Sequence, residues 1–171
     1  IGVIMKVNVY KVRENAKLPV RAHPTDAGMD LFFCPEADEP VTVRGSRTCL
    51  LQTGLKIEVP EGYMLEVKNK SGIASKKQLV TGACVVDSGY DGEIFVNLHN
   101  IGERAQVVQP GQKIAQGVFV KVEQPLLVEI EEDNIYGGTT KRGSGALGST
   151  GDFWWLLQPE NYREKNTRKL K

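Results

Sequence analysis

The sequence has 171 residues, a length that suits one domain with a substantial core. Its 22 Lys and Arg residues almost balance its 21 Asp and Glu residues. A near-neutral chain attracts no polyanion over its whole surface, so we expect no nucleic-acid partner. No apolar run approaches the roughly 20 residues that span a membrane, so we expect no membrane partner either.

The N-terminus and the cysteines indicate the compartment. Residues 1–4 are too short for a signal peptide and lack its charged first segment, and we expect Met5 to be the natural first residue. The cysteines, Cys34, Cys49 and Cys84, are odd in number and lack paired spacing. They predict thiols in a reducing compartment and no disulfide framework or zinc site. We therefore expect a cytoplasmic protein, or a nuclear or host-cell one if the source is viral, and not a secreted one.

Short, alternating, β-branched segments dominate the first 130 residues. In chain order, the predicted strands are a first strand from Val7 to Val12, then 41–43, 55–59, 64–67, 93–98, 105–108, 114–122 and 126–130. Turn sequences rich in Gly and Pro separate several of them. The one predicted helix, residues 73–79, is short. The pattern indicates an all-β barrel or sandwich.

The composition changes near Asn134. Residues 136–151 are rich in Gly, Ser and Thr and offer almost nothing to bury, which predicts a mobile C-terminal arm. We therefore divide the chain into a β core (1–133), an arm (134–151) and an aromatic and basic tail (152–171).

Two segments combine groups that suit a bound anion. Residues 142–151 bring an arginine, hydroxyls and many small-residue amides together, although a flexible linker is the commoner meaning of such a segment. Lys70, Ser71 and Gly72 place a cation, a hydroxyl and helix-start amides at one point. For this second segment the alternative is an ordinary helix start.

A third segment, residues 85–92, is predicted to be a β-hairpin, because two valines lead into a turn sequence and a strand follows. Asp87 follows the two valines. We expect its carboxylate to be half-buried and held rigidly enough to act as a base. A turn aspartate that bonds its own backbone is the alternative.

Together these segments resemble the five ordered motifs of the trimeric dUTPase family. The matching segments are Ala27–Leu31, Lys70–Ala74, Cys84–Glu93, Gly111–Gln116 and Arg142–Gly151. The resemblance implies a jelly-roll-like β-barrel that forms a homotrimer, with each active site shared between subunits. It also implies hydrolysis of dUTP to dUMP and pyrophosphate with Mg²⁺, which limits uracil in DNA and supplies dUMP for dTMP synthesis.

The resemblance further assigns roles around the phosphates. Asp87 is the base that deprotonates the water attacking the α-phosphorus. Asp30 contacts the metal through water, as Mg²⁺ sites often require. Lys70, Ser71, Gly72 and Gln116 bind phosphates, and Arg142 reaches the γ-phosphate when the arm closes.

The same resemblance assigns the base and the sugar. The backbone near Val85 and Val86 reads uracil, and Phe95 on the following strand contributes to that pocket. Tyr90 lies against the deoxyribose and leaves no room for a 2′-hydroxyl. In the arm, Leu147, Gly148 and Ser149 belong to the segment that covers the nucleotide.

The sequence departs from the family pattern at three positions. Lys70 stands where the family usually has Arg, so a point charge replaces a bidentate fork. Leu147 stands where the family usually stacks Phe on uracil, and the lost stack is worth about 0.5–1.5 kcal/mol. Cys84 replaces the usual Gly of the hairpin. In the tail, Phe153, Trp154 and Trp155 either anchor the tail on a neighbouring subunit or cover the base in place of Phe.

Two other functions remain open. A dCTP deaminase shares this barrel, but that family carries a proton-shuttling Glu where this chain has Asn97, and an amide cannot shuttle protons. A nucleotide-sensing binding module without turnover is the second alternative, because the three departures are compatible with a lost activity.

Overall fold

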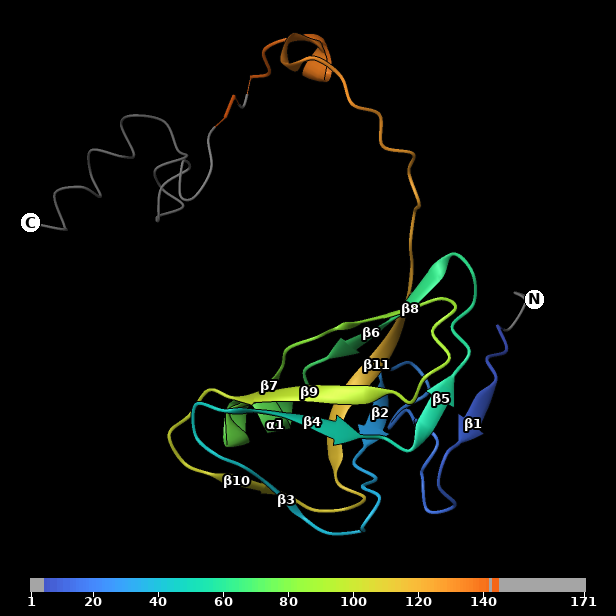
Figure 1. The fold of residues 1–171 in the computed structure, drawn as a ribbon, viewed down its shortest axis with the longest axis vertical. Coiled ribbons are helices and arrows are strands. Elements are labelled where there is room, and N and C mark those ends of the chain that lie inside the picture. Colours follow the sequence, from blue (N-terminus) through green and yellow to red (C-terminus); the bar gives the residue numbers. More distant parts are fainter. Residues whose placement is uncertain (1–4, 142, 145–171) are drawn as a thin grey trace, which may run out of the picture. The chain divides into compact units, whose positions relative to one another are not determined.

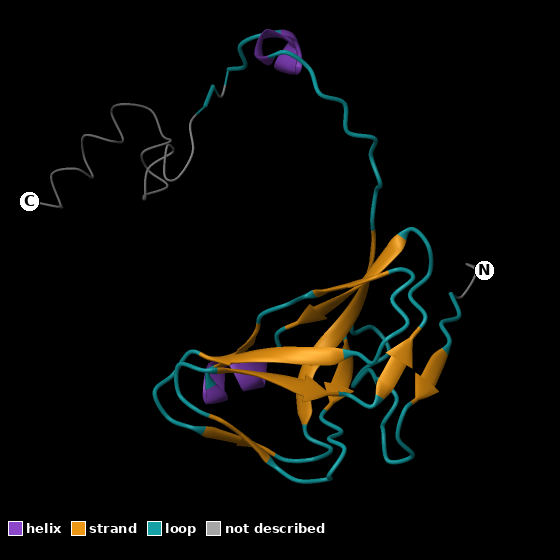
Figure 2. Cartoon of the chain, in the orientation of Figure 1, coloured by secondary structure: helices purple, strands orange, loops and turns teal. Residues whose placement is uncertain are grey.

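The computed structural model describes residues 5–141, 143 and 144. The chain divides into two units, residues 1–125 and 126–171, which are treated separately (Figure 1). The first unit contains the eleven strands and the α-helix of the described residues, and strands make up most of its regular structure (Figure 2).

The strands pair antiparallel in four small sheets. Two sheets are strand pairs, β1 (Val9–Lys11) with β5 (Leu55–Ile57) and β3 (Val41–Val43) with β10 (Gln106–Val108). A third has the order β4 (Thr48–Gln52), β9 (Phe95–Asn100), β7 (Leu79–Thr81). The fourth has the order β2 (Met29–Phe32), β11 (Lys113–Lys121), β6 (Tyr63–Lys68), β8 (Val85–Asp87). The all-β, jelly-roll-like prediction is confirmed, although the sheets do not close into one barrel.

Alternation along the strands supplies the core. In β9, Val96 and Leu98 point inward and are fully buried, whereas Phe95 is 42% exposed. Such inward residues, together with Leu51 and Ile114 from other strands, form one continuous cluster. Burial of each such side chain contributes about 1.5–3 kcal/mol, so this cluster fixes the strands that carry the site residues.

The nine-residue strand β11 positions the fourth sheet, because it lies between β2 and β6. Gln116 stands opposite Asp30 on one side and Lys68 on the other. Gly117 is packed closely, since a Cβ there would lie 2.9 Å from the side chain of Leu65. Three distant segments of the sequence therefore meet on one sheet.

Most predicted strands are confirmed with small shifts of their ends, and residues 41–43 match β3 completely. The helix predicted over 73–79 is α1 (Ser71–Lys77), which begins two residues earlier. The strand predicted over 126–130 is wrong, because this segment has no regular structure and Leu126 and Leu127 are 89% and 87% exposed. The strands β2, β4 and β7 were not predicted.

In the second unit, the described residues contain one 3₁₀ helix, η1 (Glu132–Gly137), and are exposed throughout. The predicted boundary after residue 133 stays a prediction. The predicted site residues Arg142, Leu147, Gly148 and Ser149 lie outside the described residues, as do the three tail aromatics. Within the described part, no helix combines the length and the apolar character that crossing a bilayer requires.

Candidate active site

The first group of site residues surrounds Asp30, the only described carboxylate that is buried, at 5% exposure. Lys70 Nζ donates a hydrogen bond of 2.6 Å to Asp30 Oδ1. Lys113 Nζ lies 2.7 Å from Oδ2 in an ion pair without hydrogen-bond geometry, so Oδ2 is a buried oxygen with no hydrogen bond. Burial raises the pKa of the Asp30 carboxyl, but the two ammonium groups lower it by more than burial raises it. The pKa of Asp30 therefore lies below its ordinary value.

Gln116 joins this group through the backbone. Its side-chain amide donates a hydrogen bond of 2.9 Å to the carbonyl of Asn69, the residue before Lys70. Gly28 makes room for it, because a Cβ at that position would lie 2.1 Å from Gln116 Oε1. The first, second and fourth motifs of the sequence therefore converge in the folded chain.

Ser71 and Gly72 are exposed at the start of α1. Lys70 is the N-cap residue, with extended backbone and no side-chain hydrogen bond to the first turn. Its carbonyl instead accepts the amides of Ile73 and Ala74 at 2.9 Å each. The first two amides of the helix, those of Ser71 and Gly72, are left without a side-chain cap.

The second group lies around β8 and the turn that follows it. The β-hairpin predicted over 85–92 is wrong, because β8 pairs with β6 and the next strand, β9, pairs with β4 and β7 in another sheet. Val85, Val86, Asp87, Tyr90 and Phe95 line a common pocket of about 210 Å³, and the structure thus brings five predicted site residues together. Leu50, Ala83, Glu93, Ile94 and Asn97 complete its lining. Within the described residues β8 is the last strand of its sheet, so one side of its backbone faces no other strand.

Tyr90 occupies a defined place in this pocket although it is 47% exposed. Its hydroxyl donates a hydrogen bond of 3.0 Å to the carbonyl of Glu93. The ring passes close to the backbone of Gly92, where a Cβ would lie 2.3 Å from the hydroxyl oxygen. Glycine at position 92 is therefore required for this ring position.

Asp87 ends β8 and is exposed in the single chain. The prediction that it is half-buried is wrong for the isolated chain, because the valine before it points to the core and Asp87 takes the opposite face of a strand. Its carbonyl accepts the amide of Tyr90 at 3.3 Å, which closes the turn.

One chain keeps the two groups apart. Asp87 lies opposite Met64 at one end of β6, whereas Gln116 lies opposite Lys68 at the other. The distance from position 64 to 68 is roughly 13 Å along a strand. Within the described residues no three His, Cys, Asp or Glu side chains converge, so a metal ion at either group would need ligand oxygens from a bound molecule or from water.

Sequence reasoning missed several residues of these groups. Lys113 lies inside the fourth motif, but its distance of three positions from Gln116 would place the two side chains on opposite faces of a regular strand. A register shift between Lys113 and Ala115 changes this alternation, and the sequence gives no sign of it. Asn69 adjoins the second motif and accepts the amide of Thr81 at 2.6 Å. Arg13 binds Glu93 across 80 residues of sequence, and no local pattern indicates that pair.

Comparisons with known proteins agree with this geometry. The family model for dUTPase matches residues 14–151. The chain is 37% identical over 144 residues to the deoxyuridine 5′-triphosphate nucleotidohydrolase of Chlamydia trachomatis serovar L2, covering 83% of this chain and 96% of that protein. It is 38% identical over 141 residues to the enzyme of the same name from Caulobacter vibrioides, covering 80% and 88%.

Solved structures give the same result. A mutant dUTPase of Staphylococcus bacteriophage 80alpha, solved with dUpNHpp, superposes with a TM-score of 0.73 at 27% identity and covers 85% of this chain and 98% of that one. A mutant dUTPase from phage phi11 of S. aureus, described with a structural Mg(II) ion, gives a TM-score of 0.68, also at 27% identity, over 75% and 98%. With a family match over most of its length and relatives above one-third identity, the chain belongs to the dUTPase family.

Proposed function

We propose that this chain hydrolyses dUTP to dUMP and pyrophosphate, as a homotrimer and with Mg²⁺. The observation that carries the proposal is the pocket lined by Asp87 and Tyr90, where a carboxylate, a tyrosine and the outer strand of a sheet meet. In a cell, this reaction limits uracil in DNA and supplies dUMP for dTMP synthesis.

The base enters beside the free edge of β8. Unpaired amides and carbonyls near Val85 and Val86 offer alternating donors and acceptors, which match the edge of uracil and mismatch the amino group of cytosine. Phe95 lines the pocket from the next strand. Asn97 lines it as well, in the place where a deaminase needs a carboxylate, and its Oδ1 accepts the Thr48 hydroxyl at 3.3 Å. This favours hydrolysis over deamination.

The sugar lies against Tyr90. The ring is held by its hydrogen bond to the Glu93 carbonyl and fills the wall of the pocket next to Asp87. A ribose would carry an additional hydroxyl toward this ring, and the steric conflict selects a deoxyribose. Tyr90 is thus the residue that separates dUTP from UTP.

Asp87 provides the chemistry. Its exposed carboxylate can accept a proton from a water molecule, which then attacks the α-phosphorus while pyrophosphate leaves. Asp30 fits a water-mediated contact to Mg²⁺, because among the described residues its Oδ2 is contacted by the Lys113 ammonium group alone, at 2.7 Å, and a carboxylate oxygen can accept a further hydrogen bond from a metal-bound water. When bound, Mg²⁺ neutralises charge on the phosphate oxygens. Lys70, Ser71, Gly72 and Gln116 hold the phosphates.

A shared site follows from the separation of the two groups. The base must lie within one water of the α-phosphorus, yet in one chain it is roughly 13 Å along β6 from the residues that hold the phosphates. Groups from two copies satisfy both requirements. The exposed apolar segment 126–130 also needs a covering surface, and a neighbouring copy supplies one. We assign Arg142, Leu147, Gly148 and Ser149 of the arm to closure over the nucleotide.

The test is pyrophosphate release from dUTP by the purified chain with Mg²⁺. We expect turnover of dUTP, no ammonia from dCTP, and no turnover by Asp87→Asn although this variant still binds the nucleotide. Absence of turnover in a folded, trimeric wild-type sample would refute the proposal and favour a binding module. Near-normal turnover by Asp87→Asn would refute the assignment of the base.

A further inference from the structure

A largely buried ion pair anchors the loop that carries Tyr90. Arg13 lies just after β1, and its guanidinium forms a two-pronged pair with the Glu93 carboxylate, one prong being Nη1 to Oε2 at 3.3 Å. The side chains of Arg13 and Glu93 are 17% and 13% exposed. A pair that is both forked and largely desolvated fixes direction as well as distance.

Both partners have further bonds that tie the pair to the β core. Arg13 Nε donates to the carbonyl of Cys34 at 3.1 Å, and Glu93 Oε1 accepts the amide of Gly54 at 2.8 Å. Burial lowers the pKa of the Arg13 guanidinium, but its hydrogen bonds to Glu93 and Cys34 outweigh this, and its pKa lies above its ordinary value.

Glu93 also holds the side chain of Tyr90 through its backbone. The Tyr90 hydroxyl donates to the Glu93 backbone carbonyl at 3.0 Å. The next residue is fixed as well, because the carbonyl of Ile94 accepts the Thr53 hydroxyl at 2.7 Å. The position of the tyrosine ring thus depends on the backbone at 93 and 94.

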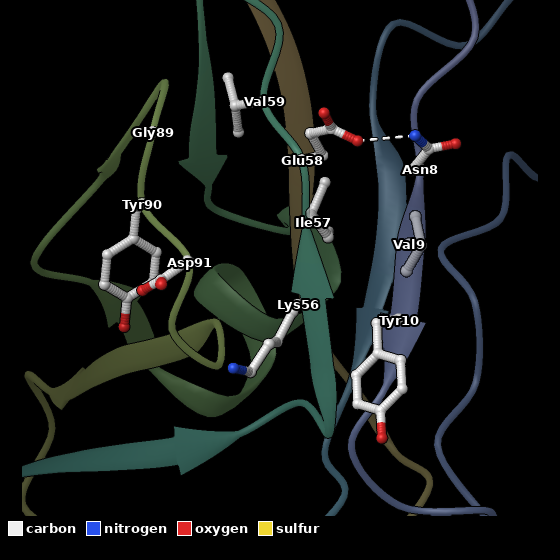
Figure 3. Close-up of a pocket in the computed structure, with 10 residues that line it drawn as sticks. All are labelled: Asn8, Val9, Tyr10, Lys56, Ile57, Glu58, Val59, Gly89, Tyr90 and Asp91. Carbon is white, nitrogen blue, oxygen red and sulfur yellow. Dashed lines mark hydrogen bonds between the residues drawn. The ribbon is translucent and has the colours of Figure 1, made fainter.

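The other side of the loop gives no support. A cavity of about 360 Å³ lies between the loop tip, residues 89–91, and residues 56–59 at and after the end of β5 (Figure 3). The tip is exposed, and a Cβ at Gly89 would meet nothing within 4 Å. A loop that borders an open space is held by its ends, and the end after Tyr90 is Glu93.

We infer that Arg13 and Glu93 are positioning residues for substrate specificity: by fixing the backbone under Tyr90, they set how strongly the enzyme prefers dUTP to UTP. This inference rests on the proposed function. Neither side chain needs to touch the reacting phosphate for this role. The expected signature is a loss of discrimination at the sugar, while the chemical step is affected less.

The test uses Glu93→Gln and Arg13→Lys in the full chain, and measures kcat and KM for dUTP and for UTP. We expect the ratio of kcat/KM for dUTP to that for UTP to fall about tenfold in Glu93→Gln, the scale of one lost charged hydrogen bond. Arg13→Lys keeps the charge but loses the fork, so it should give a smaller fall. Glu58→Gln is the matched control, because Glu58 borders the cavity and accepts a hydrogen bond of 2.6 Å from Asn8, and its side chain has no hydrogen bond to residues 89–93 (Figure 3).

A double-variant cycle separates positioning from general stability. Tyr90→Phe removes the hydroxyl bond to Glu93, so its effect on the ratio should be less than additive with Glu93→Gln. Unchanged ratios in both Arg13→Lys and Glu93→Gln, with a lowered unfolding midpoint alone, would overturn the inference and leave a purely structural pair. If Glu93→Gln does not fold, the ratio in Arg13→Lys decides. Failure of the wild-type chain to hydrolyse dUTP would instead refute the proposed function.

Discussion

Asp30→Asn tests the physical account of the buried carboxylate. Asp30 is 5% exposed, whereas the side chains of Lys70 and Lys113 are 32% and 45% exposed. Removing one partner of a fully buried pair costs about 3–5 kcal/mol, but these lysines can turn toward water once the carboxylate is gone. The substitution therefore removes one charged hydrogen bond and one half-exposed ion pair. Together these lower the free energy of unfolding by about 2–3 kcal/mol at neutral pH.

The pH dependence gives this prediction its sign. The pKa of Asp30 is lowered in the folded chain relative to its ordinary value of 3.8, so its contribution is complete above about pH 4. It is lost as the pH falls through the lowered value, since the protonated acid then resembles the amide. The stability difference between wild type and Asp30→Asn should therefore shrink in acid.

Urea unfolding at equal protein concentration, at neutral pH and in acid, measures both quantities. A loss below about 1 kcal/mol at neutral pH would show that the two ion pairs contribute no more than surface pairs do. A difference that stays constant into acid would refute the lowered pKa. Lys68→Met is the control, because Lys68 pairs with Glu66 on an exposed face and its removal should change the stability little at either pH.

Three further predictions concern stability and metal. Asn100→Ala should cost about 2–4 kcal/mol in urea unfolding, because the buried amide joins the carbonyls of Val43 and Arg104 at 2.9 and 2.8 Å and accepts the amide of Gly102; a loss under about 1 kcal/mol would contradict this. Gly45→Ala should lower the free energy of unfolding by about 3 kcal/mol, because the new Cβ would lie 2.1 Å from a backbone carbonyl oxygen. Gly62→Ala should lower it by about 1 kcal/mol, because Gly62 has a φ of 76° but borders open space. Equal losses for the two variants would refute the steric argument. A chelator should stop pyrophosphate release and leave the unfolding midpoint unchanged, because the described residues form no cage of three metal-ligating side chains.

Local pattern was sufficient where a segment carries its own periodicity. Residues 41–43 alternate and form β3, and a turn follows Asp87 where the turn residues predict one. The predicted hairpin does not form, because β8 finds its partner in the distant strand β6. The convergence of Asp30, Lys70 and Gln116 followed from the family motifs, not from spacing. The neighbours of those motifs explain how the convergence is held.

The wrong and missed predictions have a common physical cause: strands and ion pairs depend on a partner that lies far away in the sequence. Residues 126–130 have a suitable composition for a strand, yet in the single chain they form none. Conversely, the sequence of β4 lacks a clear strand pattern, and Thr48 and Leu50 are exposed, but pairing with β9 along five residues stabilises the strand. The Arg13–Glu93 pair was missed for the same reason, since only the tertiary fold brings the two side chains together.

The unpaired edge of β8 has a practical consequence for handling the protein. Open backbone at a sheet border attracts extended segments of other molecules, and the exposed Val85 beside it adds an apolar contact. The three-residue length of the strand limits that hazard but does not remove it. A nucleotide bound there would occupy the same hydrogen-bonding groups. Protein solutions stored with dUMP should therefore aggregate more slowly than solutions without it.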